Sequence, residues 1–122
     1  MNECIIGVGS NIEPRKNIAL MLTLLQEKVH LDSVSDWVKT APIGITDQPD
    51  FVNGAVRIRT PMNWLQLNNT LKLLEDNMGR DRSAPKYGSR VIDLDIIVWN
   101  GLVVDDDYYH RTFLRNCVDQ LR

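Results

Sequence analysis

Two aspartates separated by a single residue stand out in an otherwise apolar stretch. In GSRVIDLDIIVW, residues 88–99, Asp93 and Asp95 flank one leucine. Side chains on a strand alternate between two faces. Both carboxylates therefore point the same way, and the opposite, core face carries Ile92, Leu94, Ile96 and Val98. Like charges on one face repel unless something positive lies between them, and the candidates are a divalent metal, a cluster of arginines, or solvent.

A basic loop precedes this pair. Residues 80–90 contain one acid, Asp81, and four cations: Arg80, Arg82, Lys86 and Arg90. Carboxylates, a hard cation and arginines together suit polyphosphate chemistry. Mg²⁺ takes one or two carboxylates and completes its coordination with water and phosphate oxygens, while arginines neutralise the charge of a transferred group. Spacing alone also allows a purely structural network in which Arg80 and Arg90 pair with the aspartates.

A second candidate site lies in residues 40–53. Phe51 and Asn53 share one face of a predicted strand. An aromatic ring beside an amide suits a flat heterocycle, because the ring stacks and the amide matches the donor–acceptor edge. A core phenylalanine and a turn asparagine are the alternative. The turn at residues 9–11 could offer backbone N–H groups to an anion, or could simply cap a helix.

Composition sets the class of protein. The 122 residues are 43% hydrophobic and 25% charged, which predicts one globular domain over residues 1–122. A net charge of −2 argues against nucleic acid or an anionic membrane as a partner. Cys4 and Cys117 lack metal-binding spacing, and we find neither a signal peptide nor an apolar run of about 20 residues. A reduced, cytoplasmic protein is expected.

The order of predicted elements indicates the fold. Apolar patterning predicts strands at residues 4–9, 32–40, 51–60 and around the two aspartates, with a hairpin turn at Asn100-Gly101. One helix is expected from Pro14 to Val29, capped by Ser10 or Asn11. A second begins at Pro61, with Thr60 as its cap, and ends at Gly79. A short tail helix covers 111–121. The order βαββαβ predicts an α+β, ferredoxin-like fold: an antiparallel sheet with helices on one face and the ligand site on the other.

Three blocks of this sequence resemble one enzyme family. GVGSN, TAPIGITDQPDFVNGAV and EDNMGRDRSAPKYGSRVIDLDIIVWNG are similar to the 6-hydroxymethyl-7,8-dihydropterin pyrophosphokinases (2-amino-4-hydroxy-6-hydroxymethyldihydropteridine diphosphokinases). The blocks agree with the family in order and spacing over residues 4–101. The region after the hairpin, DDDYYHRTFLRN, is contracted relative to the family, and Tyr87 stands where tryptophan is usual.

The resemblance implies an ATP-dependent transferase of folate biosynthesis. Such an enzyme moves a pyrophosphoryl group from ATP to 6-hydroxymethyl-7,8-dihydropterin and leaves AMP. Asp93 and Asp95 would hold two Mg²⁺ ions, and Arg80, Arg90 and Asp95 would be catalytic. The pterin pocket would comprise Thr40, Pro42, Ile43, Phe51, Asn53 and Phe113. The nucleotide side would comprise Gln48, Glu75, Arg82, Tyr87, Ile96, His110 and Arg111.

Two other functions stay open at this point. The contracted tail fits a catalytically weak or inactive paralogue that binds a pterin or nucleotide. An RNA-binding ferredoxin-like module would need exposed aromatics and a basic face where this chain has carboxylates. A monomer or a homodimer is expected, because a shortened tail could leave apolar surface for a second copy to cover.

Overall fold

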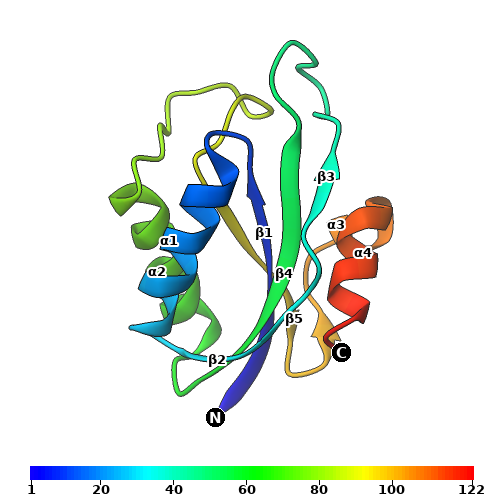
Figure 1. Cartoon of the computed structure of the whole chain (residues 1–122). Coiled ribbons are helices and arrows are strands. Elements are labelled where there is room, and N and C mark those ends of the chain that lie inside the picture. The colour runs from blue at the N-terminus through cyan, green and yellow to red at the C-terminus, as the bar shows by residue number, and fades with distance from the viewer.

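The fold is one antiparallel sheet with helices on both sides. The structure is a computed structural model that describes residues 1–122. Its elements, in chain order, are β1 (Asn2–Ser10), α1 (Pro14–Gln26), β2 (His30–Val34), β3 (Val38–Thr40), β4 (Phe51–Thr60), α2 (Trp64–Asn77), β5 (Asp93–Trp99), β6 (Leu102–Val103), α3 (Asp107–His110) and α4 (Thr112–Asp119). Figure 1 shows α1 and α2 on one side of the strands and α3 and α4 on the other.

The strand order confirms the ferredoxin-like prediction. Neighbouring strands run β2-β4-β1-β5-β6, with β3 also paired to β4, and every pairing is antiparallel. β1 is central, and all its residues from Cys4 to Ser10 are buried. A strand covered on both faces reads as a continuous apolar and small-residue run, as CIIGVGS does.

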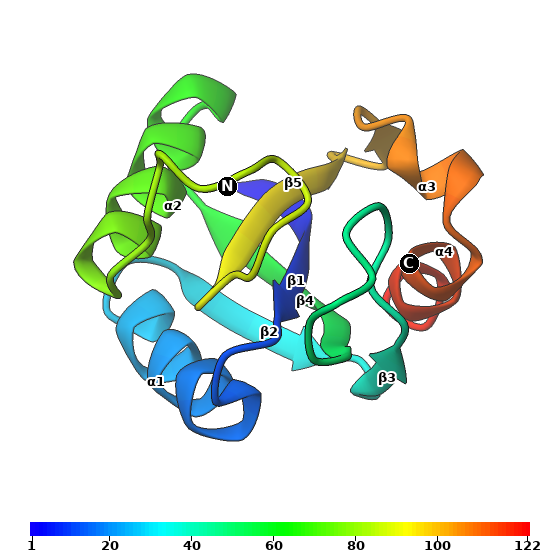
Figure 2. The same cartoon turned by 90° about the horizontal axis from the view of Figure 1, so that it is seen from above.

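Two hydrophobic cores lie on opposite faces of the sheet. The larger core lies under α1 and α2, and the smaller one lies where α4 packs on the other face. Viewed from above, the two helix layers flank the sheet (Figure 2). The prediction placed the helices on one face, and α1 and α2 lie there, whereas the tail helix α4 packs on the other face. The tail helix α4 covers only part of the second face, so the rest of that face is free to form a cleft.

A β-bulge in β5 corrects one predicted core position. Ile6 pairs with Ile96, but Ile5 pairs with Val98, so Ile97 is an extra residue without a partner in β1. An extra residue inverts the alternation beyond it. Ile92, Leu94 and Ile96 lie in the larger core as predicted, whereas Val98 lies in the smaller one.

Both long helices begin differently from the prediction. Pro14 does open α1, but its N-cap is Glu13, with φ 38°, and no side chain caps it. Ser10 instead donates to the Val91 carbonyl at 2.6 Å, and the Asn11 backbone N–H donates to the Arg90 carbonyl at 3.0 Å. These bonds tie the end of β1 to the segment before β5, and the second of them occupies the Asn11 N–H that an anion would need.

The second helix begins three residues later than predicted. Thr60 remains paired with Asn2 in the sheet, so it is not free to cap a helix. Asn63 is the cap, and it forms a reciprocal capping box with Gln66 at 2.9 Å in each direction. Gly79 follows the helix with φ 95°, as predicted.

The predicted strand at residues 32–40 is two strands. Val34 pairs with Val56, and Val38 pairs with Asn53. The chain therefore advances four residues between these pairings, whereas β4 advances only three. Ser35 fills the break, because its hydroxyl accepts the Ala55 N–H at 2.8 Å. The hairpin turn at Asn100-Gly101 and the tail helix are confirmed. No helix is both long enough and apolar enough to cross a bilayer.

Candidate active site

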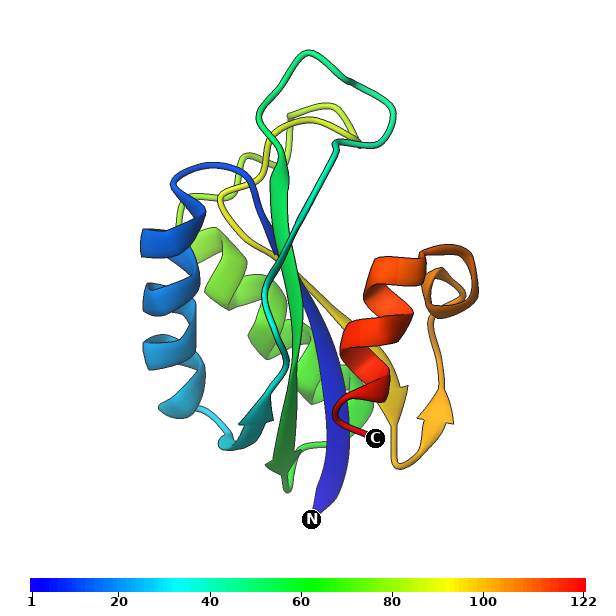
Figure 3. The same ribbon diagram turned by 45° about the vertical axis from the view of Figure 1, so that its right-hand side comes forward.

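A cleft of about 360 Å³ opens on the second face of the sheet, beside α4. Two loops, residues 41–50 and 78–92, rise above the same end of the strands (Figure 3). The cleft is lined by Gly7, Val8, Gly9, Thr40, Ala41, Ile43, Phe51, Asn53, Lys72, Arg80, Lys86, Tyr87, Gly88, Arg90, Asp93, Asp95, Ile97, Asp107, Arg111, Phe113 and Leu114. Strands β1, β4 and β5 therefore form its floor, and loops and α4 form its walls.

The two aspartates share the floor with two glycines. In the pairing of β1 with β5, Gly9 lies opposite Asp93 and Gly7 opposite Asp95. A Cβ at Gly9 would come within 2.9 Å of the Asn53 side-chain oxygen. At Gly7 a Cβ would meet Leu114 at 3.1 Å and Ile97 at 3.2 Å, so the two glycines let neighbouring side chains approach the strand closely. This part of the floor was not recognised in the sequence.

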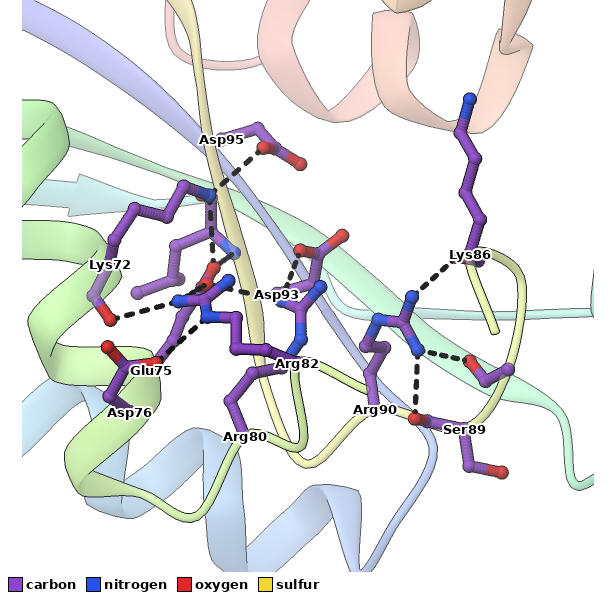
Figure 4. A network of polar contacts seen from close by, with 12 residues as sticks. Lys72, Glu75, Asp76, Arg80, Arg82, Lys86, Ser89, Arg90, Asp93 and Asp95 are labelled. Carbon is purple, nitrogen blue, oxygen red and sulfur yellow. Dashed lines mark hydrogen bonds and ion pairs between the residues drawn. The ribbon is translucent and has the colours of Figure 1, made fainter. Parts of the chain in front are cut away.

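A buried glutamate organises the cations around the aspartates (Figure 4). Glu75 is fully buried in α2, and its Oε2 accepts the Leu94 N–H at 2.7 Å. Its Oε1 lies 3.1 Å from both Arg80 and Arg82, and its Oε2 lies 3.3 Å from the Lys72 ammonium. A buried charge is tolerated when it is paired and hydrogen-bonded in this way.

Each aspartate receives one of these cations. Arg80 Nη1 donates to Asp93 Oδ1 at 3.1 Å, and Lys72 Nζ lies 3.4 Å from Asp95 Oδ1. Of the two arginine–aspartate pairs that the spacing allowed, only Arg80–Asp93 is present. Arg90 instead donates to the backbone carbonyls of the loop, at Pro85, Lys86, Gly88 and Ser89.

The ionised form of Asp95 is disfavoured by its surroundings. Burial, followed by the charge of Asp93, raises the pKa of Asp95 to about 6 from 3.8. Lys72 opposes this shift, and Glu75 and Asp105 add to it. A carboxylate whose ionised form is destabilised by burial and by a neighbouring carboxylate would be stabilised by a bound cation.

The other end of the cleft is aromatic and amide-bearing. Phe51 and Asn53 lie on one face of β4, as predicted, and Phe113 of α4 also lines the cleft. The Asn53 amide donates to the hydroxyl of Thr40, which lies on the neighbouring strand β3. This bond fixes which edge of the amide remains for a ligand.

One glutamine joins the two loops outside the cleft. Gln48 Nε2 donates to the carbonyls of Ile45 and Tyr87, both at 2.7 Å. Its Oε1 accepts from Asn11 at 2.9 Å and from Ser89 at 3.2 Å. Gln48 therefore supports the loops and does not line the cleft.

Most of the predicted site residues meet in this cleft. Those that line it are Thr40, Ile43, Phe51, Asn53, Arg80, Tyr87, Arg90, Asp93, Asp95, Arg111 and Phe113. Those outside its lining are Pro42, Gln48, Glu75, Arg82, Ile96 and His110. The side chain of Ile96 is buried in the core on the helix face, and its expected nucleotide contact stays a prediction. Arg82 bonds to Asp76 and Glu75 beside the cleft.

Three charged residues in the lining were missed as site residues. Lys72, Lys86 and Asp107 all line the cleft. Lys72 could have been found from its position three residues before Glu75, which places both on one side of α2. Asp107 lies in α3, and its carboxylate lies 3.7 Å from Arg111.

Comparison with known proteins agrees with this geometry. The family model described as 7,8-dihydro-6-hydroxymethylpterin-pyrophosphokinase (HPPK) matches residues 5–121. The 2-amino-4-hydroxy-6-hydroxymethyldihydropteridine pyrophosphokinase of Haemophilus influenzae is 31% identical over 84% of this chain and 65% of its own length. The Bacillus subtilis protein of that name is 35% identical over 81% of this chain and 60% of its own length.

Plant relatives are larger. The mitochondrial folate synthesis bifunctional protein of Pisum sativum is 37% identical over 86% of this chain but only 21% of its own length. The chain thus spans less than two thirds of the length of these relatives. A match over nearly all of the chain, with the aspartate pair on the cleft floor, settles the family. This chain belongs to the 7,8-dihydro-6-hydroxymethylpterin-pyrophosphokinase family.

Proposed function

We propose that this protein, as a single pyrophosphokinase-like domain, transfers a pyrophosphoryl group from ATP to 6-hydroxymethyl-7,8-dihydropterin in folate biosynthesis. The main support for this proposal is that Asp93 and Asp95 line the same cleft as the aromatic ring of Phe51 and the amide of Asn53. In the reaction the pterin hydroxyl oxygen bonds to the β-phosphorus of ATP. The bond from that phosphorus to the α–β bridging oxygen breaks, AMP leaves, and the hydroxyl proton is released.

Asp93 and Asp95 would hold two Mg²⁺ ions. Two carboxylates on one face, both lining the cleft, fit an ion that takes one or two carboxylates and shares phosphate oxygens. When bound, Mg²⁺ supplies charge neutralisation of the triphosphate and of the developing oxyanion. We assign no further ligand, because no cluster of three or more acidic, histidine or cysteine side chains surrounds the pair.

The other cleft residues position the two substrates. Thr40, Phe51 and Asn53 would bind the pterin, with Phe113 on the opposite wall and Pro42 and Ile43 at the rim. Arg80, Arg90 and Arg111 would neutralise phosphate charge. Most of the work is orientation and electrostatics, because phosphoryl transfer needs little covalent chemistry from the protein.

The remaining predicted residues belong to the nucleotide side. Glu75 and Arg82 would hold the cations and Gln48 the loops from outside the lining, Tyr87 would act from within it, and His110 would contribute beside α4. The two cysteines are free and buried, which supports the expected reduced, cytoplasmic location. A monomer or homodimer completes the proposal.

The test is AMP formation by purified protein supplied with ATP, Mg²⁺ and 6-hydroxymethyl-7,8-dihydropterin. AMP should appear only when all three are present and should vanish for Asp95→Ala. Pterin binding by calorimetry without any AMP would instead establish the binding-only alternative. Neither binding nor AMP would overturn the proposed substrates.

A further inference from the structure

Lys72 is a cation of the cleft lining that lies on helix α2 and not in a loop or in the C-terminal tail. Lys72 projects from α2 towards β5, and its ammonium meets three oxygens (Figure 4). It lies 2.8 Å from the Leu94 carbonyl, 3.3 Å from Glu75 Oε2 and 3.4 Å from Asp95 Oδ1. An ammonium has three N–H donors, and these three oxygens provide one acceptor for each donor.

Two of these contacts hold the ammonium in place. Glu75 is fully buried and is itself fixed by Arg80, Arg82 and the Leu94 N–H. The Leu94 carbonyl belongs to the backbone of the same strand as Asp95. The third contact, to Asp95, is the longest, and the carboxylate there is half-exposed to the cleft. The lysine is therefore anchored by the protein and reaches one oxygen of the aspartate pair.

We propose that Lys72 is a tethered cation that pairs with Asp95 and competes with a divalent ion for that carboxylate. A metal bound to Asp95 would lie within a few ångströms of the ammonium, and like charges at such distances repel. The metal must therefore displace the Lys72 ammonium from Asp95, or bind despite the repulsion from that ammonium. Lys72 thereby lowers metal affinity until a polyphosphate adds negative charge to the cleft.

This inference rests on the proposed function, because it takes Asp93 and Asp95 as the metal ligands. Its experiment uses neither ATP nor pterin, so a failure of turnover would not affect it. Binding of Mn²⁺ alone, as a probe for Mg²⁺, is followed by loss of the spectrum of the free ion in electron paramagnetic resonance. The measurement is made at about pH 8, well above the pKa of Asp95, which is about 6.

Three variants isolate the lysine. Lys72→Met keeps most of the apolar stem and removes the charge. Lys72→Arg keeps the charge. Lys86→Met removes a charge from the same cleft lining, but Lys86 lies against Tyr87 and contacts neither aspartate. Circular dichroism melts show whether each variant folds.

The expected result is that Lys72→Met binds Mn²⁺ roughly five- to tenfold more tightly than the parent. Lys72→Arg and Lys86→Met should stay within about twofold of it. Unchanged or weaker binding by folded Lys72→Met would overturn the proposal, as would equal tightening by Lys86→Met. The absence of Mn²⁺ binding by every variant at millimolar concentrations would also overturn it.

Discussion

The two faces of the sheet differ in what their side chains do. On the face towards α1 and α2, the central strands carry Ile6, Val8, Leu94 and Ile96, all buried among helix side chains. On the other face, the same strands carry glycines and aspartates beneath an open cleft. Side chains alternate along β1 and β5, so a residue in the core that stabilises the fold is followed by one that faces the cleft. Substitutions of neighbouring residues in β5 should therefore have opposite kinds of effect.

The largest effect is expected on the cleft face. Asp95→Ala should lower the rate of AMP formation by roughly a thousandfold or more, because it removes a metal ligand. The fold should persist, since the change also removes repulsion from Asp93. The measurement is AMP by chromatography together with a thermal melt. A melting temperature that falls with activity would show that the carboxylate is structural.

Glu75 does not line the cleft, and we expect it to affect activity through the cations that it positions. Glu75→Gln keeps the shape but weakens its bonds to Arg80 and Lys72, and should reduce activity by about ten- to a hundredfold. The matched control is Asp76→Asn, the exposed neighbour that contacts only Arg82. If both variants lose activity equally, Glu75 has no special role in orienting the site.

A substitution on the face towards α1 and α2 should change the stability of the fold and leave activity unchanged. Ile96→Ala removes a buried side chain from the larger core and should cost about 2–5 kcal/mol in the free energy of unfolding. The folded protein should turn over at the parental rate, because Ile96 does not line the cleft. Urea unfolding gives the first quantity, and assays well below the melting temperature give the second. A large fall in kcat without lost stability would place Ile96 in the site after all.

The smallest effect concerns pH. The pKa of Asp95 is raised from 3.8 to about 6 in the folded protein, so the folded state binds more protons than the unfolded state between about pH 4 and 6. This group therefore lowers stability as pH rises through that window. Asp95→Asn should consequently gain stability over the parent at about pH 8 and little at about pH 4. Urea titrations of both proteins without metal check this, and an advantage independent of pH would contradict it.

The sequence predicted the local features of both faces well. Alternation placed Asp93 and Asp95 together, and turn chemistry placed Asn100-Gly101 and Gly79 correctly. These features depend on residues that are adjacent in the chain. The family resemblance added lining residues such as Ile43, Arg111 and Phe113, which no periodicity could have given.

What the sequence missed depends on contacts between distant segments. The bulge at Ile97 is set by pairing with β1, and it moved Val98 to the other core. Thr60 looks like a cap until its pairing with Asn2 is known. Lys72 reads as an ordinary surface lysine of a helix until β5 is placed beside it.

The central claim is that a divalent metal binds on the cleft face of β1 and β5. The most direct test is Mn²⁺ added with a non-hydrolysable ATP analogue to isotope-labelled protein, followed by amide signal broadening in nuclear magnetic resonance. The account predicts broadening centred on Gly7, Gly9, Asp93 and Asp95, with the amides of α1 little affected. Broadening centred instead on the acidic residues 105–107, with the amides of β1 and β5 sharp, would contradict it.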